Sequence, residues 1–189
     1  MSIRKLRTIE MKRLSLEEFK QADKKPLVVV LDDVRSMYNV GSVFRTADAF
    51  RIEAVYLCGI SATPPANEIH KTALGAEDSV EWKCYNTALD AVKDLKQCGY
   101  ETYAVEQAEG STKLHHFTPQ AEKKYAVILG NEVKGVHQEV IDACNGCLEI
   151  VQFGTKHSMN VSVTAGIIIY TLSEKLRKTP QEQYLSQEP

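Results

Sequence analysis

The run Leu27-Val-Val-Val-Leu-Asp-Asp-Val34, followed by a helix-like segment at residues 40–50, decides the fold class. The run is continuously apolar over a strand's length, as expected of a strand that is buried on both faces. The segment after it carries apolar residues at helical spacing, namely Val40, Val43, Phe44 and Ala47. A buried strand followed by an amphipathic helix is the repeating unit of a parallel α/β sheet.

The same alternation continues along the chain. Five further apolar or β-branched runs have strand length, at residues 53–60, 78–85, 101–107, 124–132 and 147–153. Helical spacing of apolar residues recurs at 66–74, 86–97, 136–143 and 161–177. We therefore predict an α/β fold, with a mostly parallel sheet and helices on both of its faces.

Three regions of different character divide the 189 residues. Residues 1–25 are predicted to form a basic helical arm, since Ser15 and Glu18 match a capping box and Pro26 limits the helix. Residues 26–178 have the length of one domain, and the polar residues 179–189 are expected to be a tail.

Charge is distributed unevenly along the chain. Residues 1–25 hold eight basic and four acidic side chains, a net charge of +4, whereas the remainder holds 15 basic and 21 acidic ones, a net charge of −6. A basic arm can supply the phosphate contacts that dominate nucleic-acid affinity. A solvated surface helix explains the same composition, so charge alone leaves both interpretations open.

The cysteines and the hydropathy indicate the compartment. Five cysteines, an odd number, are scattered through core-like sequence, which is unlike a disulfide framework. No apolar run reaches the roughly 18–20 residues of a membrane span. We therefore expect a cytoplasmic protein with reduced thiols and no membrane contact. Cys144 and Cys147 form a CxxC without a second pair, so we expect no metal.

Asn39 and Arg45 follow the first predicted strand. Asn39 stands where a helix N-cap belongs, directly before the apolar helix face. Arg45 lies among apolar residues, where a guanidinium needs an anion or a carboxylate because it cannot cheaply lose its charge. The residues leave two interpretations open: an arginine that faces a ligand, or a structural ion pair with Asp32, Asp33 or Asp48.

Two more polar clusters follow later strands. Glu132 ends the stretch Leu129-Gly-Asn-Glu132, where a carboxylate can hold a basic group or cap a helix. Ser158 and Asn160 precede the apolar segment 161–177 and are residue types that cap helices. Ligands of open α/β sheets bind beyond the carboxyl ends of the strands, so the three clusters together predict a site there.

These clusters are similar to the three motifs of the SpoU family of RNA ribose methyltransferases, over about residues 26–177. The motifs are Asn39-x5-Arg45, Gly130-x-Glu132 and Ser158-x-Asn160-x-Ser162. The resemblance implies a SPOUT-type fold with a C-terminal trefoil knot, which binds S-adenosylmethionine (SAM). It also implies a homodimer whose active site uses both subunits, and methyl transfer to a ribose 2′-hydroxyl of structured RNA, either tRNA or rRNA. The third motif has Val151-Gln152 where Pro-Met is common, and Met159 where Leu is frequent.

Site residues follow from the resemblance position by position. The catalytic set it implies is Arg45, Asn39, Glu132, Ser158 and Asn160. Arg45 would lie beside the ribose hydroxyl, either as proton acceptor or as an orienting group, since arginine has a pKa above about 12. The cofactor-binding positions it implies are Val105, Gly130, Ile150, Ser158 and Met159. His70 and Lys71 match a loop and helix near the substrate side of the family, which implies contact with RNA, and a solvated surface explains them equally well.

Two other kinds of protein share some of these sequence features. A catalytically silent RNA-binding protein on the same fold is the main alternative, and the intact polar clusters count against it. An unrelated nucleotide binder would need a phosphate loop, but the sequence contains neither GxxxxGK[ST] nor GxGxxG. The sequence does not indicate which RNA or which nucleotide is modified.

Overall fold

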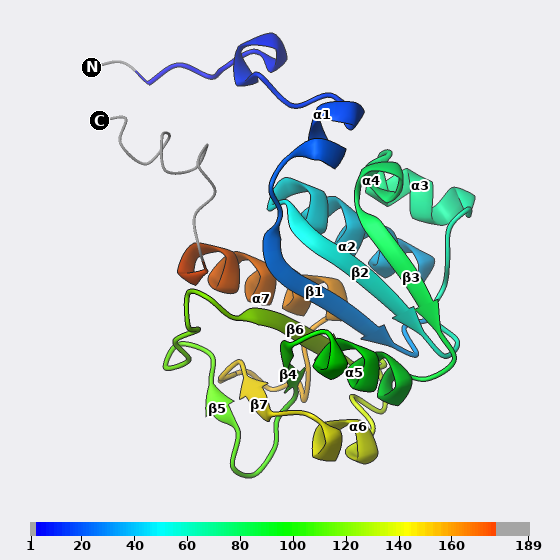
Figure 1. Cartoon of the computed structure of the whole chain (residues 1–189), viewed down its shortest axis with the longest axis vertical. Helices are drawn as coiled ribbons and strands as arrows, with labels where there is room; N and C mark the ends of the chain where they lie inside the picture. Colours follow the sequence, from blue (N-terminus) through cyan, green and yellow to red (C-terminus); the bar gives the residue numbers. More distant parts are fainter. Residues whose placement is uncertain (1–2, 177–189) are drawn as a thin grey trace.

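A seven-stranded sheet forms the centre of the computed structural model, which describes residues 3–176 (Figure 1). The strands are β1 (Lys25–Asp32), β2 (Ile52–Cys58), β3 (Glu81–Tyr85), β4 (Tyr100–Val105), β5 (Thr112–Lys113), β6 (Lys124–Leu129) and β7 (Gly146–Glu149). They lie in the order β3-β2-β1-β6-β4-β7-β5, and every pairing between them is parallel. The predicted α/β class with a mostly parallel sheet is confirmed.

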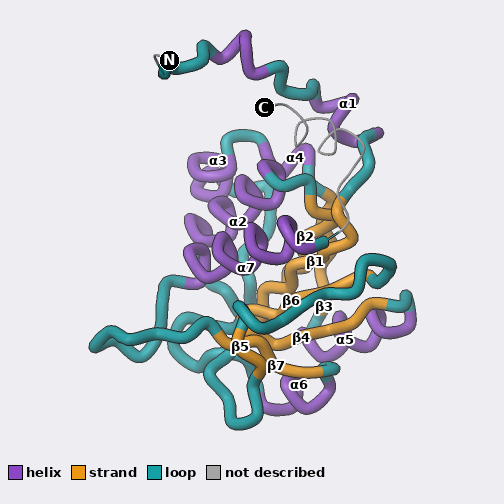
Figure 2. The backbone as a smooth tube through the Cα atoms, turned by 90° about the vertical axis from the view of Figure 1, so that its left-hand side faces the viewer, coloured by secondary structure: helices purple, strands orange, loops and turns teal. Residues whose placement is uncertain are grey.

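Helices cover both faces of this sheet (Figure 2). One face packs against α2 (Met37–Ala49), α3 (Asn67–Ala73), α4 (Ala76–Ser79) and α7 (Val161–Lys175). The other packs against α5 (Ala88–Gln97) and α6 (Gln138–Ala143). β1 lies between the two cores: Leu27, Val29 and Leu31 face the first, whereas Val28 and Val30 face the second. This explains why its sequence is apolar without alternation.

The N-terminal arm is only partly helical. It contains the short 3-10 helix η1 (Thr8–Met11) and α1 (Leu16–Gln21), and its outer part extends away from the sheet (Figure 1). The predicted capping box is confirmed, because Ser15 Oγ accepts from the Glu18 amide at 3.2 Å and Glu18 Oε2 accepts from the Ser15 amide at 2.7 Å. Phe19 is buried in the core. The inner end of the arm is thereby fixed to the domain.

Several element boundaries differ from those predicted. α2 begins three residues earlier than expected, and β7 ends at Glu149, so the stretch 150–153 is not strand. β5 and α4 were not predicted, since elements of two and four residues are too short to show periodicity. Arg177, the predicted end of the last helix, and the tail 179–189 lie outside the described residues.

The strand order reverses between β1 and β6. From β1 the chain builds the sheet outward through β2 and β3, whereas β4, β7 and β5 lie beyond β6. Loops that leave such a reversal separate to opposite sides of the sheet and leave a crevice at its carboxyl edge. Two of the three polar clusters follow these two strands: Asn39 and Arg45 lie on α2, the helix after β1, and Glu132 lies in the loop after β6.

Candidate active site

A cleft of about 270 Å³ opens where the loops after β4, β6 and β7 meet the start of α7. Its walls contain all five positions that the sequence suggested for the cofactor: Val105, Gly130, Ile150, Ser158 and Met159. Leu129 and Val161 add apolar surface, and Glu106, Glu132 and Lys134 add charge. The structure therefore brings the suggested cofactor positions into one cavity.

The loop after β6 makes one wall of the cleft by folding back on itself. Asn131 and Gly135 exchange backbone hydrogen bonds of 3.2 and 2.9 Å, and Asn131 Oδ1 accepts from the amides of Val133 and Lys134. Gly130 has no room for a side chain, because a Cβ there would lie 2.1 Å from the carbonyl carbon of Gly135. A glycine is thus required by close backbone approach.

Glu106 and Gln107, after β4, hold the neighbouring walls together. Glu106 Oε2 accepts from the Val136 amide at 3.2 Å, and Gln107 Nε2 donates to the His157 carbonyl at 2.6 Å. The cleft is therefore joined by polar contacts between loops far apart in the sequence. The sequence analysis missed both residues, although their position directly after a strand was a usable signal.

Three of the predicted catalytic residues form a hydrogen-bonded chain beside the cleft. Asn39 Nδ2 donates to Glu132 Oε1 at 3.0 Å, and Asn160 Nδ2 donates to Asn39 Oδ1 at 3.1 Å. Asn160 also caps α7, its Oδ1 accepting from the Ser162 amide at 2.9 Å. One residue from each sequence motif takes part, so the motifs that are separate along the chain make one polar group.

The predicted N-cap role of Asn39 is wrong. Ser36 is the N-cap of α2, and its Oγ accepts from the Asn39 amide at 3.3 Å. Asn39 therefore lies inside the first turn, and its side chain is available to bridge Glu132 and Asn160. Ser36 is itself a preferred capping type, so its identity was a signal that the helix begins earlier.

Arg45 lies elsewhere. Its exposed side chain lines a groove between the arm and the side of α2, together with Lys12, Arg13, Asp48 and Arg51. We call this surface the arm groove. The described residues do not support the alternative of a structural ion pair. Asp48 accepts from Ser79 Oγ at 2.7 Å, and no carboxylate among residues 3–176 pairs with Arg45.

The CxxC cysteines lack the features of a reactive pair. Burial raises the pKa of Cys144 to about 11, and burial also raises the pKa of Cys147. Redox cysteines need the opposite shift, because the thiolate is the reactive form. All five cysteines are free.

His70, on α3, is exposed, with its Nδ1 2.6 Å from Glu77 Oε1. Its contact with RNA, like that of Lys71, stays a prediction. Within residues 3–176, no helix combines the length and apolar character needed to cross a bilayer.

Comparison with known proteins shows the family of this chain. The model of the SpoU rRNA Methylase family matches residues 26–170. The 23S rRNA (guanosine-2'-O-)-methyltransferase RlmB of Neisseria meningitidis is 30% identical over 149 residues, which cover 76% of this chain and 56% of the relative. RlmB of Nitrosomonas europaea is 32% identical over 76% of this chain and 54% of the relative. The chain spans a little over half the length of these relatives.

Solved structures agree in fold. The A. aeolicus TrmH/SpoU tRNA modifying enzyme superposes with a TM-score of 0.75 at 22% identity, covering 92% of this chain and 86% of that one. An AdoMet-bound rRNA methyltransferase from Sinorhizobium meliloti gives a TM-score of 0.75 at 25% identity, covering 88% and 62%.

Proposed function

Because the chain belongs to the SpoU rRNA Methylase family, we propose that it transfers a methyl group from SAM to a ribose 2′-hydroxyl of a structured RNA, either tRNA or rRNA. The observation that carries the proposal is the hydrogen-bonded chain of Glu132, Asn39 and Asn160 at the mouth of the cleft. Neither helix capping nor packing explains why three motif residues from separate elements should meet beside a cavity.

The cleft residues fit SAM. Gly130 and Gly135 line the cleft without side chains of their own, which suits a cofactor held by backbone groups. Val105, Ile150 and Met159 supply apolar walls, and Ser158 supplies a hydroxyl. When bound, SAM supplies a sulfonium-activated methyl group. We also propose that the C-terminal part of the chain forms the trefoil knot that the family resemblance implies.

A ribose hydroxyl is a poor nucleophile, so the protein must orient it and assist the loss of its proton. Asn39, Glu132 and Asn160 offer amide and carboxylate groups that are already fixed by one another. Arg45 is assigned to the hydroxyl and its neighbouring phosphate, as proton acceptor or as orienting cation. Both roles require Arg45 to reach the attacking oxygen.

A homodimer meets that requirement, because Arg45 lines the arm groove and not the cleft of its own chain. One stripe of α7 suits contact with a second copy: Val163 and Tyr170 are 54% and 56% exposed, with Ile167 between them. We place the protein in the cytoplasm, where five free cysteines stay reduced. The arm, residues 1–25, would add phosphate contacts.

The direct test is methyl transfer from labelled SAM to RNA of a strain that lacks the protein, followed by mass-spectrometric mapping of the ribose methylations. Transfer to one nucleotide of tRNA or rRNA supports the proposal. Tight RNA binding without transfer would instead favour a catalytically silent RNA-binding protein.

Subunit complementation tests the shared site. Arg45→Ala and Gly130→Ala chains, each inactive alone, are mixed under conditions that exchange subunits. If Arg45 acts on its partner's cleft, each mixed dimer has one complete site, and random pairing restores about one quarter of the wild-type activity. No recovery in dimers shown to be mixed would contradict the shared site.

A further inference from the structure

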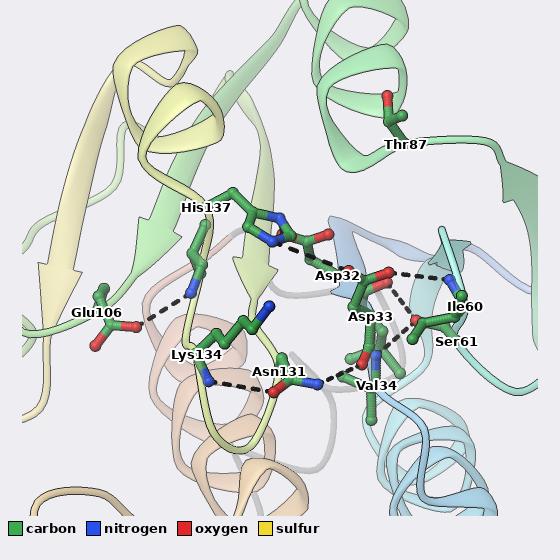
Figure 3. Close-up of polar contacts among 12 residues, drawn as sticks. Asp32, Asp33, Val34, Ile60, Ser61, Thr87, Glu106, Asn131, Lys134 and His137 are labelled. Atoms are coloured by element: carbon green, nitrogen blue, oxygen red, sulfur yellow. Dashed lines mark hydrogen bonds and ion pairs between the residues drawn. The ribbon is translucent and has the colours of Figure 1, made fainter.

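A cluster of Asp32, Asp33 and His137 lies outside the cleft, on the carboxyl edge of the sheet (Figure 3). Asp32 is the last residue of β1, Asp33 follows it, and His137 is the residue before α6. Asp32 Oδ2 lies 3.2 Å from His137 Nδ1, and Asp33 Oδ2 lies 4.0 Å from His137 Nε2. One ligand atom from each side chain falls within 4.8 Å of the other two.

One carboxylate oxygen of the buried member, Asp32, lacks a hydrogen bond of regular geometry, although His137 lies close to it. The Asp32 side chain is only 4% exposed, and its Oδ2, which points at His137, accepts no hydrogen bond of regular geometry from the described residues. A buried carboxylate oxygen without a regular hydrogen bond is costly, so a cation or a donor is expected there. His137 is 42% exposed, which leaves a route from solvent to this oxygen.

Asp33 is held in place by its surroundings. Its φ of +56° is in the left-handed region, its Oδ1 accepts from the Ile60 amide at 3.0 Å, and its carbonyl accepts from Asn131 Nδ2 at 2.9 Å. The fixed Oδ1 leaves Oδ2 on the side of His137, as Figure 3 shows. The cluster is therefore built from a rigid pair of carboxylates facing one imidazole.

We propose that Asp32, Asp33 and His137 bind one divalent transition-metal ion. Two ligands about 2.1 Å from a tetrahedral ion lie about 3.4 Å apart. Asp32 Oδ2 and His137 Nδ1 are 3.2 Å apart, close to that separation. An imidazole with two carboxylates is a ligand set suited to Mn²⁺ or Zn²⁺, and water can complete the coordination on the exposed side.

The position of the cluster indicates a structural role for the ion. His137 ends the loop that starts at Gly130 and forms a cleft wall, whereas Asp32 ends β1 and Asp33 follows it. None of the three lines the cleft. An ion held among them would fasten this loop to the sheet without touching the reacting atoms.

The test is a titration of the full-length, chelator-treated protein with Mn²⁺, followed by calorimetry and by Mn²⁺ electron paramagnetic resonance. Mn²⁺ is the first probe because thiols bind it weakly, whereas the five cysteines would compete for Zn²⁺. We expect one Mn²⁺ per chain and a higher thermal midpoint with the ion. A Zn²⁺ titration with blocked thiols is the second arm.

Two variants keep the test decisive. Asp33→Asn retains an acceptor for the Ile60 amide and tolerates the left-handed backbone, so it should fold. His137→Ala removes no helix cap, because the His137 side chain makes no capping hydrogen bond. Each should weaken ion binding at least tenfold and abolish the shift in midpoint.

The matched control is His115→Ala/His116→Ala, which removes an exposed histidine pair outside the cluster. It should bind Mn²⁺ like the wild type. If neither ion binds the wild type, or if Asp33→Asn and His137→Ala bind as tightly as it does, the metal site is wrong. His137 would then be only an ion-pair partner of the two acids.

Discussion

The cleft and the arm groove are built differently, although α2 contributes to both. At the cleft end of α2, Asn39 is fixed by two hydrogen bonds to residues from other elements. Six residues later, Arg45 is exposed in the arm groove, among other basic side chains and with no ion pair inside residues 3–176. The first region is preorganised, whereas Arg45 in the second is a cation with no ion pair among the described residues.

Helix geometry explains the contrast. Six residues advance the chain by about 9 Å along the axis and about 240° around it, so Asn39 and Arg45 point to different sides. The motif that joins them in sequence therefore serves two surfaces of one chain. In the proposed homodimer, the arm groove of one subunit lies at the cleft of the other, so both residues of the motif would act at one active site.

The largest expected effect belongs to Arg45→Ala, which removes the charge from the arm groove. Methyl transfer should fall on the order of 10²–10⁴-fold. The thermal midpoint and the SAM affinity should hardly change, because Arg45 makes no ion pair with residues 3–176 and does not line the cleft. Single-turnover transfer and calorimetry measure the two.

Arg45→Lys is the control for charge alone, since lysine cannot reproduce the planar guanidinium. It should retain RNA affinity but recover little of the rate. An Arg45→Ala variant that melts early yet transfers methyl groups at the wild-type rate would reverse the assignment.

Gly130→Ala is the matching change on the cleft side. The added Cβ would collide with the backbone at Gly135, so the β6 loop must shift. We expect a loss of about 1–3 kcal/mol in stability and the loss of measurable SAM binding. Gly154→Ala, where a Cβ meets nothing within 4 Å, is the control and should bind SAM. Unchanged SAM affinity in Gly130→Ala would place the cofactor elsewhere.

The protein should bind RNA less tightly when exposed cations of the arm groove are removed. Lys12→Gln/Arg13→Gln takes two of them without touching the buried Phe19 or the capping box. Each lost phosphate contact should reduce the slope of log K against log salt by about 0.7–0.9. Lys93→Gln, an exposed lysine on α5 across the sheet, should leave the slope unchanged. An unaltered slope in the double variant would make the arm only a surface feature.

Ser36→Ala separates capping from chemistry at the cleft end of α2. Loss of the cap should cost about 1 kcal/mol of stability, as measured by denaturant unfolding, with transfer nearly intact in the folded protein. Asn39→Ala should do the reverse, because Asn39 links Glu132 and Asn160 but is not the cap. Equal stability losses in the two variants would contradict the corrected start of α2.

The smallest expected effect concerns the stability of the protein at acid pH, through Glu149 at the end of β7. Lys113, and then Ser111, hold the pKa of Glu149 below its ordinary value. The folded state therefore binds fewer protons, so this contribution is complete above the ordinary pKa of 4.5 and is lost as the pH falls through the lowered value. Glu149→Gln should flatten the acid side of the midpoint–pH curve. A curve of unchanged steepness would show that this pair does not matter.

The sequence by itself determined the α/β class, the six longer strands and the helices of six or more residues, because apolar periodicity reports which faces a segment buries and a capping box marks a helix start. It also predicted that the three polar clusters meet, since residues directly after strands gather at one edge of a parallel sheet. The cofactor positions came from the resemblance to the SpoU family. The cap at Asn160 could be read in the same way, from residue type and place.

Only the tertiary structure decided which of these polar residues touch. Asn39 was expected to cap its own helix and instead bonds to Glu132 and Asn160, 93 and 121 residues away. Arg45 was expected to have a carboxylate or a ligand beside it and lies in a groove made by the arm. Side-chain hydrogen bonds depend on how elements pack, and local periodicity records the buried face of each element but not the neighbour that covers it.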